Sequence, residues 1–199
     1  MTHPAISYAR SMDPRLEALL ADEQELQFDE FTNDTAYALG QRLVDAARAG
    51  AHAVTIDIAR GEQQLFHVAL AGTAADNDAW IRRKNRVVRR FGHSSYFVGL
   101  GLQLDGTTIE ARHLLDEREF AAHGGAFPIV VRNVGMVGTV TVSGLPQEDD
   151  HRLVAETLRA FLGSTPGDGA RHSAQRKPVA SGRGASGLSG RPSGGSSSL

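Results

Sequence analysis

The chain has 199 residues, of which 41% are hydrophobic, and a formal net charge of −2. This is enough apolar material for one good core. The absence of cysteine excludes disulfides, thiolate zinc sites and a cysteine nucleophile. No apolar run approaches the roughly 20 residues that a membrane helix needs, and charged residues interrupt the N-terminal segment where a signal peptide would be apolar. We therefore expect a soluble cytoplasmic protein without a membrane partner.

The two ends of the chain differ in composition from its middle. Residues 164–199 are mostly Gly, Ser and Pro and hold five basic residues and one acid. Such a segment has too little apolar surface to offset its ordering entropy, so we expect a disordered tail. It is either a weak basic tether for an anionic partner or a solvated segment without a specific role. Residues 1–12 are predicted to be flexible, and the remaining domain, 13–163, is acidic, which argues against a nucleic-acid partner.

The first half of this domain predicts two helices followed by a β-hairpin. In chain order we expect a short helix opened by Asp13-Pro14 and running to about Ala21, a longer helix capped by Asn33 or Asp34 and ended by Gly50, a strand over 54–58 and, after a turn at Gly61, a strand over 65–71. The caps rest on the preference of Asp, Asn and Gly for helix ends.

The second half predicts further helices and a second hairpin. We expect a helix capped by Asp76 and running to about Phe91, an apolar run to about Leu104, a connection with a short helix over 105–120, a hairpin of 127–132 with 137–143, and a last helix starting at Asp149 or Asp150. Two hairpins separated by helices indicate an α+β fold with an antiparallel sheet flanked by helices. A doubly wound parallel sheet would instead need strands that alternate singly with helices.

The helix over 76–91 places a lysine on its apolar side. At 100° per residue, Lys84 lies between Trp80 and Val88. A lysine among apolar neighbours needs a partner, which leaves two alternatives. The ammonium either anchors an anionic ligand in a pocket or forms a structural ion pair. The candidate partners for the ion pair are Asp57, Asp149 and Asp150.

Four arginines fall on the opposite side of the same helix. They are Arg82, Arg86, Arg89 and Arg90. The aromatic side chains of this helix are predicted to face inward, whereas a single-strand nucleic-acid surface interleaves aromatic and basic residues. The sequence therefore predicts an ordinary solvated face for these arginines.

Candidate ligand-binding residues gather near the ends of the predicted elements. They combine cations, imidazoles, hydroxyls, a carboxylate and glycines: Arg83, Lys84, His93, Ser94, Ser95, His123, Gly124, Gly125, Asp150 and His151. Several have a structural alternative. Ser94 can cap a helix, Gly124 and Gly125 can form a turn, and Asp150 can complement a helix dipole.

No catalytic constellation is readable. The histidine spacings do not match a zinc motif, so no metal ligand is assigned. No nucleophile lies beside a base, and no glycine-rich cofactor loop follows a strand. The catalytic residues are unknown, and the sequence favours a non-enzymatic role.

Several separated motifs occur in an order that resembles the haem-degrading-domain family, which includes GlcG-like and HbpS-like proteins, and most closely its uncharacterised protein family (UPF) branch. The motifs are Asp76-Asn77-x-x-Trp80-Ile81-x-Arg83-Lys84, Phe91-x-x-Ser94-Ser95, His123-Gly124-Gly125-x-Phe127-Pro128-Ile129, Gly138-x-Val140-x-Val142-Ser143-Gly144-Leu145-Pro146 and Asp149-Asp150-His151. The resemblance covers roughly residues 15 to 162. It implies a single domain with a profilin-like fold, assembly into a homo-oligomer, and haem binding or haem breakdown.

These observations lead to one main hypothesis and two alternatives. The main hypothesis is an oligomeric binding domain for a small anionic ligand, with haem as the candidate cofactor. Cations would engage carboxylates, one imidazole would approach iron, and glycines would shape the pocket: Arg83 and Lys84; His93, His123 or His151; Gly124 and Gly125. The alternatives are an assembly or partner-interaction protein without a small ligand, and a weak enzyme acting on a small acid or a tetrapyrrole.

Overall fold

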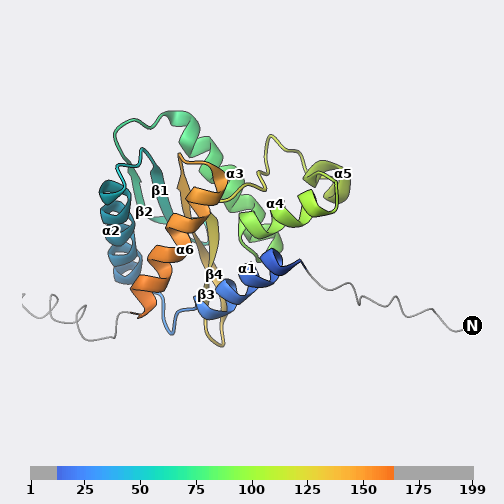
Figure 1. Ribbon diagram of the computed structural model, residues 1–199. Coiled ribbons are helices and arrows are strands. Elements are labelled where there is room, and N and C mark those ends of the chain that lie inside the picture. The colour runs from blue at the N-terminus through green and yellow to red at the C-terminus, as the bar shows by residue number, and fades with distance from the viewer. Residues whose placement is uncertain (1–12, 164–199) are drawn as a thin grey trace, which may run out of the picture. The chain divides into compact units, whose positions relative to one another are not determined.

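A four-stranded antiparallel sheet forms the centre of the computed structural model, which describes residues 13–163 (Figure 1). Its strands are β1 (Thr55–Arg60), β2 (Gln63–Ala69), β3 (Ala126–Val131) and β4 (Gly135–Ser143), in the order β2-β1-β4-β3. Both predicted hairpins are present, and β1 also pairs with β4 in an antiparallel register. The predicted flexible N-terminus and basic tail lie outside the described residues.

Helices cover both faces of the sheet. They are α1 (Pro14–Glu25), α2 (Asn33–Ala49), α3 (Ala75–Phe91), α4 (Ser95–Leu104), α5 (Ile109–His113) and α6 (Gln147–Gly163). Figure 1 shows α2 and α6 side by side on one face, where they contact each other and the strands, while α3 packs against β1, β3 and β4 from the other. The α4 helix rests against α1 and α3. This arrangement confirms the predicted α+β fold.

The face of the sheet beneath α2 and α6 is apolar. Ile56, Ile58, Val140 and Val142 alternate along β1 and β4 and are fully buried there. They pack with apolar side chains of both helices into the main hydrophobic core. The two-residue period of a strand therefore sorts these residues to one face.

The face beneath α3 is polar, although it is just as deeply buried. Its residues are those that alternate with the apolar ones: Thr55 and Asp57 in β1, and Thr139, Thr141 and Ser143 in β4. From α3, Lys84 and Asn85 reach toward this layer and are themselves buried. Asn85 donates a hydrogen bond to Asp57 and accepts one from the Thr141 hydroxyl. We call this set the polar layer; it positions the groups discussed below.

Two helix starts differ from the predictions because another side chain supplies the cap. Thr32, not Asn33 or Asp34, caps α2, since its hydroxyl accepts the backbone N–H of Thr35 at 3.1 Å. The α3 helix begins at Ala75, before the expected cap Asp76. There the Asn77 side chain reaches back and accepts the N–H of Ala74 at 2.8 Å.

Three other boundaries differ from the predictions. The α6 helix begins at Gln147, directly after Pro146, so Asp149 and Asp150 lie inside its first turn instead of starting it. The first helix is capped by Asp13 as predicted but continues to Glu25, past the expected end at Ala21. The β2 strand covers residues 63–69, not 65–71, because a two-residue turn joins it to β1. No helix among residues 13–163 has the length and apolar character to span a membrane.

Candidate functional site

A buried ion pair joins α3 to the start of α6. The Lys84 Nζ lies 2.8 Å from Asp150 Oδ2 and donates a second hydrogen bond, of 3.1 Å, to the Val142 carbonyl. Lys84 and Asp150 are 3% and 1% exposed. The prediction that Lys84 faces inward is confirmed, and so is the ion-pair alternative with Asp150 as the partner.

The other two candidate partners of Lys84 were wrong. Asp57 is held by the side chains of Gln64 and Asn85, and Asp149 pairs with Arg152 on the surface of α6. Asp150 is selected because it sits one position further along the first turn of α6, on the buried side. Its second oxygen accepts the N–H of Leu145 at 3.0 Å, which fixes the carboxylate toward α3.

Burial works against both charges of this pair. It lowers the pKa of Lys84 and raises the pKa of Asp150, while the attraction between the two groups opposes both shifts. Neither charge is therefore well stabilised without the other, and removing one leaves its partner in a low-dielectric environment.

Gly125 is required for the close approach of the backbone to this pair. It adopts a positive φ of 120°, and an added Cβ would lie 2.7 Å from Lys84 Nζ and 2.4 Å from the Val142 carbonyl oxygen. The neighbouring Gly124 is equally confined, since its Cβ would lie 1.9 Å from the Gln147 carbonyl oxygen. The two glycines therefore let the segment before β3 pack directly on Lys84 and α6.

Gly125→Ala is expected to lower the free energy of unfolding by roughly 2 kcal/mol or more, from backbone strain together with the steric clash at Lys84. Urea denaturation measures the change. Gly101→Ala is the matched control, because Gly101 lies inside α4 and an added Cβ there meets nothing within 4 Å. Equal stability of the two variants would contradict the packing role assigned to Gly125.

A polar cavity of about 280 Å³ opens beside the ion pair. We call it the polar cavity; its lining residues are Asp76, Asn77, Trp80, Lys84, His123, Ser143, Gly144, Leu145, Gln147 and Asp150. It thus brings together three predicted site residues, namely Lys84, His123 and Asp150. They come from α3, the segment before β3 and α6, which are far apart in the sequence.

A larger and less polar cavity of about 450 Å³ adjoins it. We call it the apolar cavity; it is lined by Trp80, Arg83, Gly99, Leu102, Gln103, Thr107, Thr108, Ile109, Glu117, Phe120, Ala121, Ala122 and His123. Trp80 and His123 line both cavities, and their rings meet edge to face with centroids 5.2 Å apart. These two rings therefore form the wall between an apolar space and a polar one.

Arg83 lies over the Trp80 ring and lines the apolar cavity. Its guanidinium carbon is 4.0 Å from the centroid of the Trp80 ring, a cation–π contact. The Trp80 indole N–H donates to Asp76 Oδ2 at 3.0 Å, which holds the ring in place. A cation is thus positioned at the apolar cavity, where it can pair with a ligand carboxylate.

His123 is half-buried, and its pKa is lowered by burial and by the positive charges of Lys84 and Arg83. Its imidazole is therefore neutral at neutral pH. A neutral imidazole has a free lone pair that can accept a hydrogen bond or bind a metal ion. Of the three histidines in the predicted site, it is the one that lines these two cavities.

His93, Ser94 and Ser95 lie elsewhere and tie the start of α4 to its neighbours. The His93 Nδ1 lies 2.6 Å from a carboxylate oxygen of the buried Glu23. Ser94 caps α4, since its hydroxyl accepts the N–H of Phe97 at 3.2 Å. This confirms the structural alternative that Ser94 is a helix cap. The Ser95 hydroxyl accepts the N–H of Ala126 at 3.1 Å and so joins α4 to β3.

His151 is enclosed by the protein. It is 6% exposed, its ring lies against those of Tyr96 and Phe127, and within residues 13–163 neither ring nitrogen has a hydrogen-bond partner. Burial lowers its pKa from 6.5 to about 4. It does not line either cavity.

Trp80 was missed as a site residue because helical periodicity assigned it to the apolar face of α3. Trp80 was part of the family motif that also contains Arg83 and Lys84, but the motif did not indicate a role for its ring. The cavity residues of α5 and the segment after it, such as Phe120, were also missed, since irregular segments have no periodicity to interpret.

Comparison with known proteins identifies the family. Residues 31–159 match the family model described as haem degrading protein HbpS-like. The chain belongs to this family. It is 55% identical over 150 residues to a UPF0303 protein of Streptomyces coelicolor, an alignment that covers 75% of this chain and 95% of the relative. The membership that the sequence motifs indicated is therefore confirmed.

Two solved structures share the fold of this chain. The Ybr137w protein superimposes with a TM-score of 0.71 at 35% sequence identity, covering 75% of this chain and 89% of that chain. A structure described as a PduOC:heme complex superimposes with a TM-score of 0.54 at 16% identity, covering 67% and 95%. The second likeness shows the fold alone. The profilin-like α+β arrangement expected from the family resemblance is thus observed.

Proposed function

We propose that this family member binds haem, or a related anionic tetrapyrrole, in the apolar cavity with His123 facing the iron. The observation that carries the proposal is a neutral, half-buried imidazole in the wall of an apolar cavity of about 450 Å³. Ligand cavities of roughly 300–1,000 Å³ with apolar walls and a few polar groups are typical of small-molecule sites. The haem complex of a protein with the same fold supports the choice of ligand.

The residues present fit such a ligand. Leu102, Ile109 and Phe120 supply apolar contact for a macrocycle. His123 would hold the iron through its lone pair, and Arg83 would pair with a carboxylate of the macrocycle. When bound, haem would supply an iron centre for redox or ligand chemistry.

The role of Lys84 in this proposal is indirect. Its ammonium is engaged by Asp150 and the Val142 carbonyl, so it is not the carboxylate anchor that the main hypothesis assigned to it. After burial, its positive charge is the next cause that lowers the pKa of His123. The ion pair also fixes the inner wall of the polar cavity against α6, and Gly124 and Gly125 permit this close packing.

We expect His123→Ala to weaken haem binding by roughly tenfold or more, because the nitrogen that would hold the iron is lost. Haem is titrated into the full chain and followed by the Soret band and by quenching of the fluorescence of Trp80, the chain's single tryptophan. His113→Ala is the control, since His113 is an exposed histidine of α5 outside both cavities. A wild-type protein without a Soret shift, or an unaffected His123→Ala, would refute the proposal.

The proposal favours a ligand-binding role over assembly alone, because Trp80, Arg83 and His123 together line a cavity. We still propose a homo-oligomer, as the sequence resemblance implied. Large apolar side chains at the surface, such as Leu114 and Val134, are 89% and 71% exposed and are candidates for subunit contacts. Native mass spectrometry of the purified protein reports subunit number and any retained small molecule together; a monomer would contradict this part of the proposal.

A further inference from the structure

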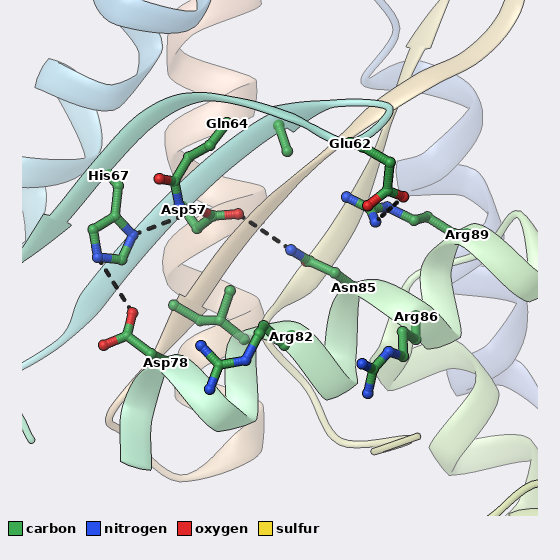
Figure 2. A pocket seen from close by; sticks show the side chains of 11 residues that line it. Asp57, Glu62, Gln64, His67, Asp78, Arg82, Asn85, Arg86 and Arg89 are labelled. Atoms are coloured by element: carbon green, nitrogen blue, oxygen red, sulfur yellow. Dashed lines mark hydrogen bonds and ion pairs between the residues drawn. The ribbon is translucent and has the colours of Figure 1, made fainter. Parts of the chain in front are cut away.

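A third cavity, of about 270 Å³, lies between the β1–β2 hairpin and α3 (Figure 2). It shares no lining residue with the polar or the apolar cavity. Arginines of α3 that the sequence assigned to a solvated face line this cavity, namely Arg82, Arg86 and Arg89. We call it the hairpin cavity. Its lining charges are separated into an acidic end and a basic side.

The acidic end is a fixed chain of polar groups. Asp57, 4% exposed, accepts hydrogen bonds from Gln64 at 2.6 Å and from Asn85 at 3.2 Å. His67 then bridges two carboxylates: its Nδ1 lies 3.5 Å from Asp57 and its Nε2 lies 3.2 Å from Asp78 (Figure 2). The second carboxylate oxygen of Asp78 has no hydrogen-bond partner in the described part of the chain. It remains available to a donor that enters the cavity.

The basic side contains one uncommitted cation. Arg89 is held by Glu62 and the Gly61 carbonyl, each at 2.6 Å, and Arg86 is held by Glu119. Arg82 has neither a hydrogen bond nor an ion pair with any of residues 13–163. Figure 2 shows its guanidinium on the α3 side of the cavity, between the Asp78 end and Arg86.

We propose that the hairpin cavity binds a small zwitterion of the amino-acid type, with its carboxylate on Arg82 and its ammonium on Asp78. A simple anion would be attracted by Arg82 but repelled by the carboxylates of Asp57 and Asp78, and a simple cation would meet the reverse. A molecule that carries both charges matches both ends. The volume lies below the range of drug-sized ligands, in keeping with a molecule of this size.

The buried Asp57 gives the site its rigidity. Burying a carboxylate that has no lysine or arginine partner is unfavourable, and here two amide donors, Gln64 and Asn85, compensate the carboxylate while the His67 ring lies 3.5 Å away. The amide bonds fix the Asp57 carboxylate, and the His67 ring lies between this carboxylate and that of Asp78. Asp57 and His67 are therefore positioning residues, and Arg82 and Asp78 are the groups that would touch the ligand.

The test uses the full chain and free L-amino acids at millimolar concentration, followed by thermal shift and by titration calorimetry. We expect one or more free amino acids to raise Tm. Their N-acetyl forms, which lack the ammonium, and their amides, which lack the carboxylate, should not. We expect Arg82→Gln to weaken the binding by roughly tenfold or more, because a charge-assisted hydrogen bond is lost.

Arg90→Gln is the matched control, since Arg90 lies on the same helix, is exposed and does not line the cavity. Haem titration of Arg82→Gln should match wild type, which separates this site from the one proposed above. The inference is overturned if no free amino acid stabilises wild type, if a blocked form binds as well as the free one, or if Arg82→Gln binds like Arg90→Gln.

Discussion

Lys84→Met is expected to lower the free energy of unfolding by about 3–5 kcal/mol, because it leaves a buried carboxylate without its cation. The carboxylate is that of Asp150, which is 1% exposed. The Val142 carbonyl also loses a hydrogen bond. Urea denaturation at neutral pH measures the loss. Arg90→Met serves as the control, since Arg90 is an exposed cation of the same helix.

The effect of the unpaired charge can be separated from the effect of lost packing by measuring stability as a function of pH. In Lys84→Met the pKa of Asp150 is no longer lowered by the ammonium, so burial raises it further. A carboxyl group whose pKa is raised in the folded state destabilises the protein least at low pH, where the group is protonated in both the folded and the unfolded chain. The deficit relative to wild type should therefore shrink as the pH falls toward the ordinary carboxyl pKa of 3.8.

A double variant, Lys84→Met with Asp150→Asn, should recover part of the stability by removing the buried charge. If Lys84→Met unfolds at the same urea concentration as wild type, Lys84 does not balance a buried carboxylate. If the double variant is no more stable than Lys84→Met, the loss comes from packing and not from charge.

The protein is expected to lose stability on acidification between about pH 6.5 and about pH 4, by roughly 3 kcal/mol from His151 alone. His151 has its pKa lowered by burial to about 4, whereas in the unfolded chain it titrates near 6.5. The unfolded state therefore binds the proton first as the pH falls through this window. Above pH 6.5 both states carry a neutral ring, and the contribution of His151 to the pH dependence vanishes.

Urea midpoints across this pH range measure the effect, and His151→Phe supplies the comparison. Phenylalanine keeps a ring beside Tyr96 and Phe127 but cannot take up a proton. The stability of this variant should fall less steeply between pH 6.5 and pH 4. Identical pH slopes in the two proteins would show that His151 is solvated or paired when the protein is folded.

Local patterns predicted the elements that rest on a regular period. Alternation at 54–58 and 137–143 located β1 and β4, and counting at 100° per residue placed Lys84 on the buried side of α3. The helix starts were less accurate, because Thr32 and Asn33 are both competent caps and only the fold decides between them.

Long-range pairing is the part that the sequence did not determine. Lys84 and Asp150 are 66 positions apart, so three carboxylates were equally eligible before the fold was known. The helical phase of α3 correctly predicted which way Arg82 points. It could not predict that the β1–β2 hairpin lies opposite Arg82 across a cavity. The burial of His151 could not be predicted for the same reason, because it depends on contacts with Tyr96 of α4 and Phe127 of β3.

The polar layer beneath α3 has a consequence for the choice of substitutions. An apolar interface keeps part of its attraction when one element shifts relative to the other, since dispersion forces have little directionality. The contacts of Asn85 with Asp57 and Thr141 depend on alignment, so a shift of α3 by one residue would break them together. The helix is thus locked in one register. Under α2 and α6, apolar substitutions that conserve volume are tolerated, whereas under α3 a substitution must also preserve the hydrogen-bond geometry.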